Sequence, residues 1–237
     1  MHFIVRGSNN KAVRIVSAML SICILCALFT LSSPVYASNE NELSDIKGHW
    51  AEDVILKWVG HGLAKGYGDG RFGPNDNITR SEFVTLLNRI FGYKEISEKS
   101  FTDVKPDAWY AQEIAKAYRA GVITGDNKGN MNPETVISRQ EAAVILTRAF
   151  RLEGDHIESV LKYADATQIA EWALNPVGIM TYRGYVSGRP GNLFAPKASL
   201  SRSAAIKMMD NVMGELINKS GTYTKVVPGN LYYRHRT

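Results

Sequence analysis

Three arginines in this sequence each follow a hydroxyl residue that is suited to cap a helix. The three pairs are Thr79-Arg80, Ser138-Arg139 and Ser201-Arg202. A glutamate stands three positions after the first two caps, at Glu82 and Glu141, which is the spacing of a capping box. We therefore expect Thr79, Ser138 and Ser201 to be N-caps and each arginine to occupy the first position of a helix.

A cation at the first helical position opposes the helix dipole and costs about 0.3–1 kcal/mol when exposed. Its occurrence in three equivalent places indicates another purpose. A helix N-terminus offers unpaired N–H groups to an anion, and an adjacent guanidinium adds a bidentate donor for carboxylate or phosphate. The sequence thus predicts anion-recognition sites at Arg80, Arg139 and Arg202. The alternative is that each arginine pairs with an aspartate of a neighbouring repeat and holds the fold together, and the two roles are compatible.

A tryptophan and an aspartate precede each arginine. The tryptophans stand 30 positions upstream, and the aspartates lie five to seven positions before them; the residues are Trp50, Trp109 and Trp172, and Asp45, Asp103 and Asp165. A tryptophan at the start of a helix is expected in the core, whereas an exposed indole beside an anion site would suit a sugar ring. The aspartates are expected either to accept hydrogen bonds from sugar hydroxyls or to cap the turn that follows.

These residues are parts of an internal repeat. A glycine stands 18 positions before each arginine, at Gly62, Gly121 and Gly184. Each repeat is expected to form a helix, a glycine-rich loop and a second helix whose apolar stripe faces the core. The stripes are Phe83, Leu86, Leu87, Ile90 and Phe91, then Ala142, Ile145, Leu146, Ala149 and Phe150, then Ala205, Met208, Met209, Val212 and Met213.

The first helix of the first repeat is expected near residues 50–59, with Ile55, Trp58 and Val59 on its buried side. In the third repeat Pro176 falls inside the matching region. We therefore expect Asn175 and Pro176 to cap a helix that starts late.

A repeat of about 55 residues with two short helices buries too little apolar surface to be stable alone. Three repeats can share one core. This predicts an all-α fold of three helix-loop-helix repeats around a pseudo-three-fold axis, with a surface groove between neighbours. The expected repeats span residues 38–92, 97–153 and 160–218, and residues 219–237 form a tail.

The first 37 residues have the layout of a secretory signal peptide. Three basic residues precede an apolar run at 15–31, and Val35-Tyr36-Ala37 supplies small residues for cleavage after Ala37. The alternative is an uncleaved membrane anchor, since the run is at the short edge of what spans a bilayer. Cleavage removes three of the positive charges, so the net charge falls from +5 to +2 and gives little support for nucleic-acid binding. Both cysteines, Cys23 and Cys26, lie in this segment.

The remaining sequence does not indicate catalysis. The five histidines are scattered, and no serine or cysteine nucleophile arrangement is visible. The turn at Gly68, Asp69 and Gly70 lacks the alternating oxygen ligands of a calcium loop, so neither a metal nor another cofactor is expected. A further alternative to a ligand-binding module is a protein–protein adaptor or lattice-forming unit.

The repeat resembles the S-layer homology family. The resemblance is carried by the box Ile78-Thr79-Arg80-Ser81-Glu82, by the loop from Gly66 to Pro74, and by the pieces His49-Trp50-Ala51 and Phe101-Thr102-Asp103. It implies a three-pronged helical module that binds secondary cell-wall polysaccharides, typically pyruvylated and linked to peptidoglycan. The expected protein is secreted and held at the cell wall, with no nucleic-acid partner and no membrane contact after cleavage. The sequence does not indicate its oligomeric state.

The third repeat departs from the family pattern because Ala204 replaces the glutamate of the box, and the second repeat lacks the tyrosine found at Tyr67. We therefore favour Arg80 and Arg139 over Arg202 as binding residues. The tail after the third repeat is read either as the end of an anchor-only protein or as the start of a further domain.

Overall fold

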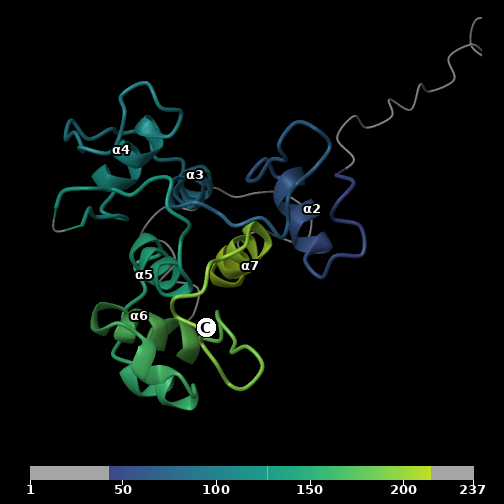
Figure 1. The fold of residues 1–237 in the computed structure, drawn as a ribbon, viewed down its shortest axis with the longest axis vertical. Helices are drawn as coiled ribbons and strands as arrows, with labels where there is room; N and C mark the ends of the chain where they lie inside the picture. Colours follow the sequence, from purple (N-terminus) through teal and green to yellow (C-terminus); the bar gives the residue numbers. More distant parts are fainter. Residues whose placement is uncertain (1–42, 127, 215–237) are drawn as a thin grey trace, which may run out of the picture. The chain divides into compact units, whose positions relative to one another are not determined.

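The computed structural model describes residues 43–126 and 128–214. The expected signal peptide and the tail at 219–237 lie outside these ranges. Six α-helices are described (Figure 1): α2 (Glu52–Gly60), α3 (Arg80–Phe91), α4 (Ala111–Arg119), α5 (Arg139–Ala149), α6 (Glu171–Tyr182) and α7 (Arg202–Met213). Two 3₁₀ turns, η1 (Ile157–Lys162) and η2 (Ala166–Gln168), precede α6. The described ranges contain isolated β-bridges and no strand, so the expected all-α class is confirmed.

The second helix of each repeat begins at its arginine because of the residue before it. Thr79 Oγ1 accepts from the Glu82 N–H while the Glu82 carboxylate accepts from the Thr79 N–H, and Ser138 and Glu141 form the same reciprocal pair. Ser201 accepts from the Ala204 N–H, but Ala204 has no carboxylate to return the bond. The third helix therefore keeps half of the capping box.

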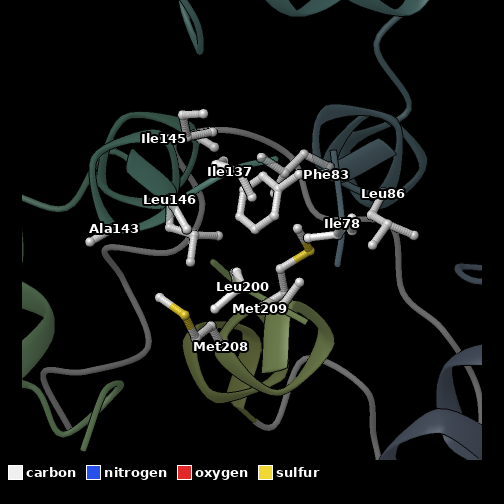
Figure 2. Packing of buried hydrophobic residues seen from close by; sticks show 14 of the residues in the cluster. Ile78, Phe83, Leu86, Ile137, Ala143, Ile145, Leu146, Leu200, Met208 and Met209 are labelled. Carbon is white, nitrogen blue, oxygen red and sulfur yellow. The ribbon is translucent and has the colours of Figure 1, made fainter. Parts of the chain in front are cut away.

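The apolar stripes of α3, α5 and α7 form the core, as expected. Figure 2 shows Phe83 of α3, Leu146 of α5 and Met209 of α7 meeting at the centre of the core, with Leu86, Ile145 and Met208 at its edges. All fifteen stripe residues are buried. Ile78, Ile137 and Leu200, one position before each cap, lie in the same cluster.

A closed ring of backbone hydrogen bonds links the three repeats at these residues. Ile78 N donates to Leu200 O, Leu200 N donates to Ile137 O, and Ile137 N donates to Ile78 O, each at 3.0 Å. Every repeat is thus bonded to both others. The pseudo-three-fold axis stays a prediction, and the cyclic order of these bonds is compatible with it.

The first helices differ from expectation in two respects. Trp50, Trp109 and Trp172 are 64%, 62% and 56% exposed, so the expectation that they belong to the core is wrong. The buried tryptophan is Trp58, whose indole Nε1–H donates to Asp210 of α7 at 3.0 Å. Ile55 and Trp58 are buried as expected, whereas Val59 is half-buried.

Helix α6 does not start late. It begins at Glu171 and contains Pro176 in its interior. Asn175 does not cap this helix: its side chain accepts from His156 N and donates to Gly154 O. The proline leaves the carbonyl of Trp172 without its usual helical donor. Trp172 lies on the exposed side of the helix, where solvent can meet that carbonyl. Within the described ranges, no helix has the length and apolarity to span a bilayer.

Candidate functional site

Each of the three aspartates holds the glycine-rich loop of its own repeat. The carboxylate of Asp165 accepts from Phe194 N and Ala195 N, both at 2.8 Å. Asp45 makes the same two bonds to Phe72 N and Gly73 N, and Asp103 makes them to Met131 N and Asn132 N. The partners lie 27 to 30 residues along the chain. The expectation that these aspartates cap the turn that follows them is therefore wrong, and both oxygens of each carboxylate already hold the loop.

The second residue that each aspartate holds has a left-handed backbone, which the two hydrogen bonds help to restrain. Gly73, Asn132 and Ala195 have φ of +69°, +51° and +56°. Glycine adopts this region freely and asparagine tolerates it, but for alanine it costs about 1–2 kcal/mol. The two charge-assisted hydrogen bonds from Asp165 offset that cost.

The arginine of each repeat reaches into the loop of another repeat. Arg139 Nε donates to Phe194 O at 2.8 Å and Nη2 donates to Ser187 O at 3.1 Å. Arg202 makes the equivalent bonds to Phe72 O and Lys65 O, at 3.0 Å each. The guanidinium groups also lie over aromatic rings, Arg139 over Phe194 and Arg202 over Tyr67 and Phe72.

Arg80 is bound less completely. Its Nη2 donates to Thr124 O at 3.2 Å, and its Nε is buried without an acceptor among the described residues. The loop that receives it carries Met131 where the other loops carry phenylalanine, and among the described residues no cation–π contact of Arg80 occurs. Burial lowers the pKa of Arg80, with Glu141 opposing the shift and Arg148 adding to it. The group still carries its charge at neutral pH.

The structural role suggested for the arginines is present, but with different partners. They bond to backbone carbonyls of the neighbouring repeat, and in the described ranges none of the three pairs with an aspartate. The carboxylates near them are the capping glutamates of a neighbouring repeat: Arg80 lies 4.0 Å from Glu141, and Arg202 lies 3.5 Å from Glu82.

This pairing changes what the third box means. The residue equivalent to Glu141 in the third repeat is Ala204, and the arginine that reaches into that repeat is Arg139. No ion pair of Arg139 occurs in the described part of the chain. The lost glutamate breaks the capping box of the third repeat, as expected, but the arginine that it leaves without a neighbouring carboxylate is Arg139. The ranking of Arg202 below Arg80 and Arg139 stays a prediction.

The helix N-termini do not offer free N–H groups to an anion. Arg80 N donates to Thr135 O and Ser81 N donates to Pro133 O, at 2.9 Å each. Helices α5 and α7 repeat this pattern with carbonyls of the third and first repeats. Since the cap occupies the next N–H, the predicted contribution of the helix end is wrong, and any anion would be recognised by the guanidinium.

The Arg80 groove, as we call it, is a cavity of about 600 Å³. Its polar lining comes from all three repeats: Arg80, Thr124, Asp126, Asn130, Glu141, Arg148 and Trp172. Asp126 accepts from the backbone N–H groups of Lys128 and Asn130, and its pKa is lowered chiefly by the bond from Asn130. This acid is thus committed to the loop, whereas Arg148 projects from α5 with an exposed side chain.

The tryptophans lie beside different partners. Trp172 lines the Arg80 groove together with residues of α5. Trp109 lines a separate cavity of about 330 Å³ with Arg89 of α3, and Trp50 packs against His49 at 5.3 Å between ring centroids. Arg89 and Arg148 both stand nine positions after a repeat arginine, where the third repeat has Asn211. We missed these second arginines, although aligning the repeats reveals them.

Comparison with known proteins finds relatives that share this repeat. The chain is 35% identical over 192 residues to the amylopullulanase of Thermoanaerobacterium thermosulfurigenes, covering 78% of this chain and 10% of that protein. It is 32% identical over 207 residues to an S-layer protein of Bacillus licheniformis, covering 86% and 23%. It is 30% identical over 174 residues to the surface-layer 125 kDa protein of Lysinibacillus sphaericus, covering 73% and 14%. The chain thus spans less than a quarter of each of these relatives.

The S-layer homology domain model matches three segments of the chain, residues 42–84, 100–143 and 162–206. Each segment begins three residues before the aspartate of its repeat and ends in the first half of the second helix, so each match falls within one structural repeat. Together they cover more than half of the chain. These matches support anchoring at the cell surface as the general role of the repeats. The chain belongs to the S-layer homology family of secreted, cell-surface proteins.

Proposed function

We propose that the protein attaches non-covalently to the bacterial cell wall by binding an anionic secondary polysaccharide linked to peptidoglycan, with a pyruvylated sugar as the bound unit. The observation that carries the proposal is the Arg80 groove, which is lined both by a half-buried arginine with an incompletely bonded guanidinium and by an exposed indole.

The groove has the chemistry that a carboxylate-bearing sugar requires. Arg80 and Arg148 supply two positive charges, and of the two acids in the lining Asp126 is bonded within its loop. Glu141 directs one oxygen to the cap of α5 and holds the other 4.0 Å from Arg80. At this distance Glu141 only partly neutralises the guanidinium, so a ligand carboxylate can approach with a net attraction.

The sugar ring is met by other residues of the groove. Trp172 is 56% exposed, and its apolar face suits the apolar face of a pyranose. The side chain of Asn130 and the backbone of Gly125 and Met131, which line the groove, offer hydrogen-bonding groups to hydroxyls. Asp103 does not bind the sugar in this proposal: it positions the loop by holding Met131 and Asn132.

Arg139 and Arg202 have a lesser part in the same proposal. Both use Nε and Nη2 on backbone carbonyls, which leaves Nη1 for a ligand. Nη1 of Arg202 also lies 3.5 Å from Glu82. Trp50 and Trp109 are exposed enough to contribute to such weaker sites, and simultaneous binding would raise the overall affinity through effective concentration.

The test is co-sedimentation of the secreted protein with purified cell-wall sacculi, before and after chemical removal of the secondary polymers. We expect binding to depend on the polymers and to weaken about tenfold or more in Arg80→Gln and in Trp172→Ala. Arg183→Gln is the matched control, because Arg183 is exposed at the end of α6 and outside the groove. Undiminished binding to stripped peptidoglycan, or full binding by a correctly folded Arg80→Gln variant, would contradict the proposal.

A further inference from the structure

A second cavity, of about 320 Å³, lies at the C-terminal ends of α3, α4 and α5. We call it the basic cavity. It contains five cationic side chains, Lys94, Lys116, Arg119, Arg148 and Arg151, and a single carboxylate, Glu95. Neither the core nor the Arg80 groove accounts for this concentration of charge.

Part of the charge has a structural explanation. Cations near helix C-termini are stabilised by the helix dipole, and each of the three ends contributes about half a negative charge. Lys116 is paired with Glu113 at 2.7 Å, and Arg119 lies 3.3 Å from Glu95. Three full charges then remain, on Lys94, Arg148 and Arg151, against about one and a half from the helix ends. The cavity therefore keeps a net positive charge.

The cavity also provides a partly buried hydrogen-bond donor. Tyr93 lines it between Lys94 and the end of α3, and burial raises the pKa of its hydroxyl to about 12, with Arg151 opposing that shift. The hydroxyl is protonated at neutral pH, so it can donate a hydrogen bond to an anion that reaches it. Guanidinium, ammonium and phenol groups together form a donor set suited to a carboxylate or a phosphate.

Arg148 connects this cavity with the Arg80 groove, since its side chain lines both. A ligand in the groove and a second anionic group in the cavity would therefore share one guanidinium. A polymer with a repeating negative charge can place one anionic group in each cavity, whereas an isolated sugar with one carboxylate cannot.

We propose that the basic cavity is a second anion site, which binds a carboxylate or phosphate group on a neighbouring unit of the polysaccharide held in the Arg80 groove. The polymer part rests on the proposed function, whereas the anion site does not. The first arm of the test therefore uses small anions alone.

In that arm the ¹⁵N-labelled secreted protein is titrated with inorganic phosphate and, separately, with pyruvate. We expect saturable shifts in the backbone amide resonances of Tyr93, Lys94 and Arg151. The double variant Lys94→Gln/Arg151→Gln should weaken this binding about fivefold or more, because it removes two of the three unpaired charges. The matched control, Lys47→Gln/Arg183→Gln, removes two exposed charges elsewhere and should bind like the wild type. The stronger of the two anions identifies phosphate or carboxylate as the preferred group.

The second arm compares wall-polymer fragments of one unit and of several units. The Lys94→Gln/Arg151→Gln variant should bind the longer fragments about tenfold more weakly than the wild type while binding the single unit normally. Equal loss in the control pair, or shifts that do not saturate, would overturn the anion site. Phosphate binding with unchanged binding of long fragments would overturn the polymer subsite. Failure of every fragment to bind any variant would instead contradict the proposed function, leaving the small-anion result to decide the cavity.

Discussion

Arg80 and Arg139 stand at the same position of consecutive repeats, yet their surroundings differ. Arg139 is 8% exposed, donates to two backbone carbonyls and lies 5.1 Å from the centroid of the Phe194 ring. Arg80 donates to one carbonyl and has a buried Nε without an acceptor in the described ranges. The first arrangement uses the cation to join two repeats, and the second leaves part of it unused.

A repeated residue therefore need not keep the same role in each repeat. A phenylalanine in the receiving loop stacks on the guanidinium, and Met131 in the second loop does not. The capping glutamate, by contrast, is present beside Arg80 and absent beside Arg139, where Ala204 replaces it. We therefore expect the Arg139 junction to matter more for stability and the Arg80 groove more for binding.

The largest effect is expected from the aspartate behind the Arg139 junction. Asp165→Asn should lower the free energy of unfolding by about 3–4 kcal/mol, because the amide NH₂ replaces one of the two accepting oxygens and faces a backbone N–H at a buried site that also holds Ala195 in a left-handed conformation. Asp103→Asn should cost about 1–2 kcal/mol, since Asp103 is half-buried and Asn132 tolerates that conformation. Urea denaturation measures both. Equal losses of unfolding free energy in the two variants would show that the loops do not account for the difference between Arg139 and Arg80.

The arginines themselves should show the next largest effect. Arg139→Gln removes two charge-assisted hydrogen bonds and a cation–π contact, and should cost about 2–3 kcal/mol of unfolding free energy. Arg80→Gln should cost about 1 kcal/mol or less, because it loses one such bond and also relieves a buried, unpaired donor. Sacculus binding should rank the two variants in the opposite order. If Arg80→Gln is the more destabilised protein, the division of roles is wrong.

Much of this arrangement was predictable from the sequence. The 18-residue spacing and the apolar stripes located the second helices, and Thr79-Glu82 and Ser138-Glu141 predicted where two of them begin. These features are local, because capping and amphipathic periodicity depend on residues within one or two turns.

The partners across repeats were not predictable in the same way. The bonds from Asp165 to the 194–195 loop and from Arg139 to Phe194 O join residues 29 to 55 positions apart. Every residue has a backbone carbonyl, so the sequence does not reveal which carbonyls accept from the arginines. The sequence pattern therefore suggested aspartates as the partners of the arginines. The exposure of Trp172 was missed for a related reason, since burial is set by where the repeats meet.

A glutamate at position 204 would make the third box like the first two. Ala204→Glu should complete the capping box with Ser201 and place a carboxylate near Arg139, raising the unfolding free energy by about 0.5–1.5 kcal/mol. The two contributions separate in a double-mutant cycle with Arg139→Gln. In the Arg139→Gln protein, Ala204→Glu should raise the unfolding free energy only by the contribution of the completed capping box. An identical gain in both backgrounds would show that residue 204 does not act on Arg139.

The smallest effect concerns the strained backbone of the third loop. Ala195→Gly should raise the unfolding free energy by about 0.5–1 kcal/mol, because glycine relieves the left-handed conformation at φ +56° while adding some entropy to the unfolded chain. The control is Ala198→Gly, in the same segment but without a positive φ, which should lower stability by a similar amount. Because Asp165 bonds to the N–H of residue 195, the benefit should shrink in an Asp165→Asn background, where the loop is free to relax. A gain that is undiminished there would mean that the strain is not held by the aspartate.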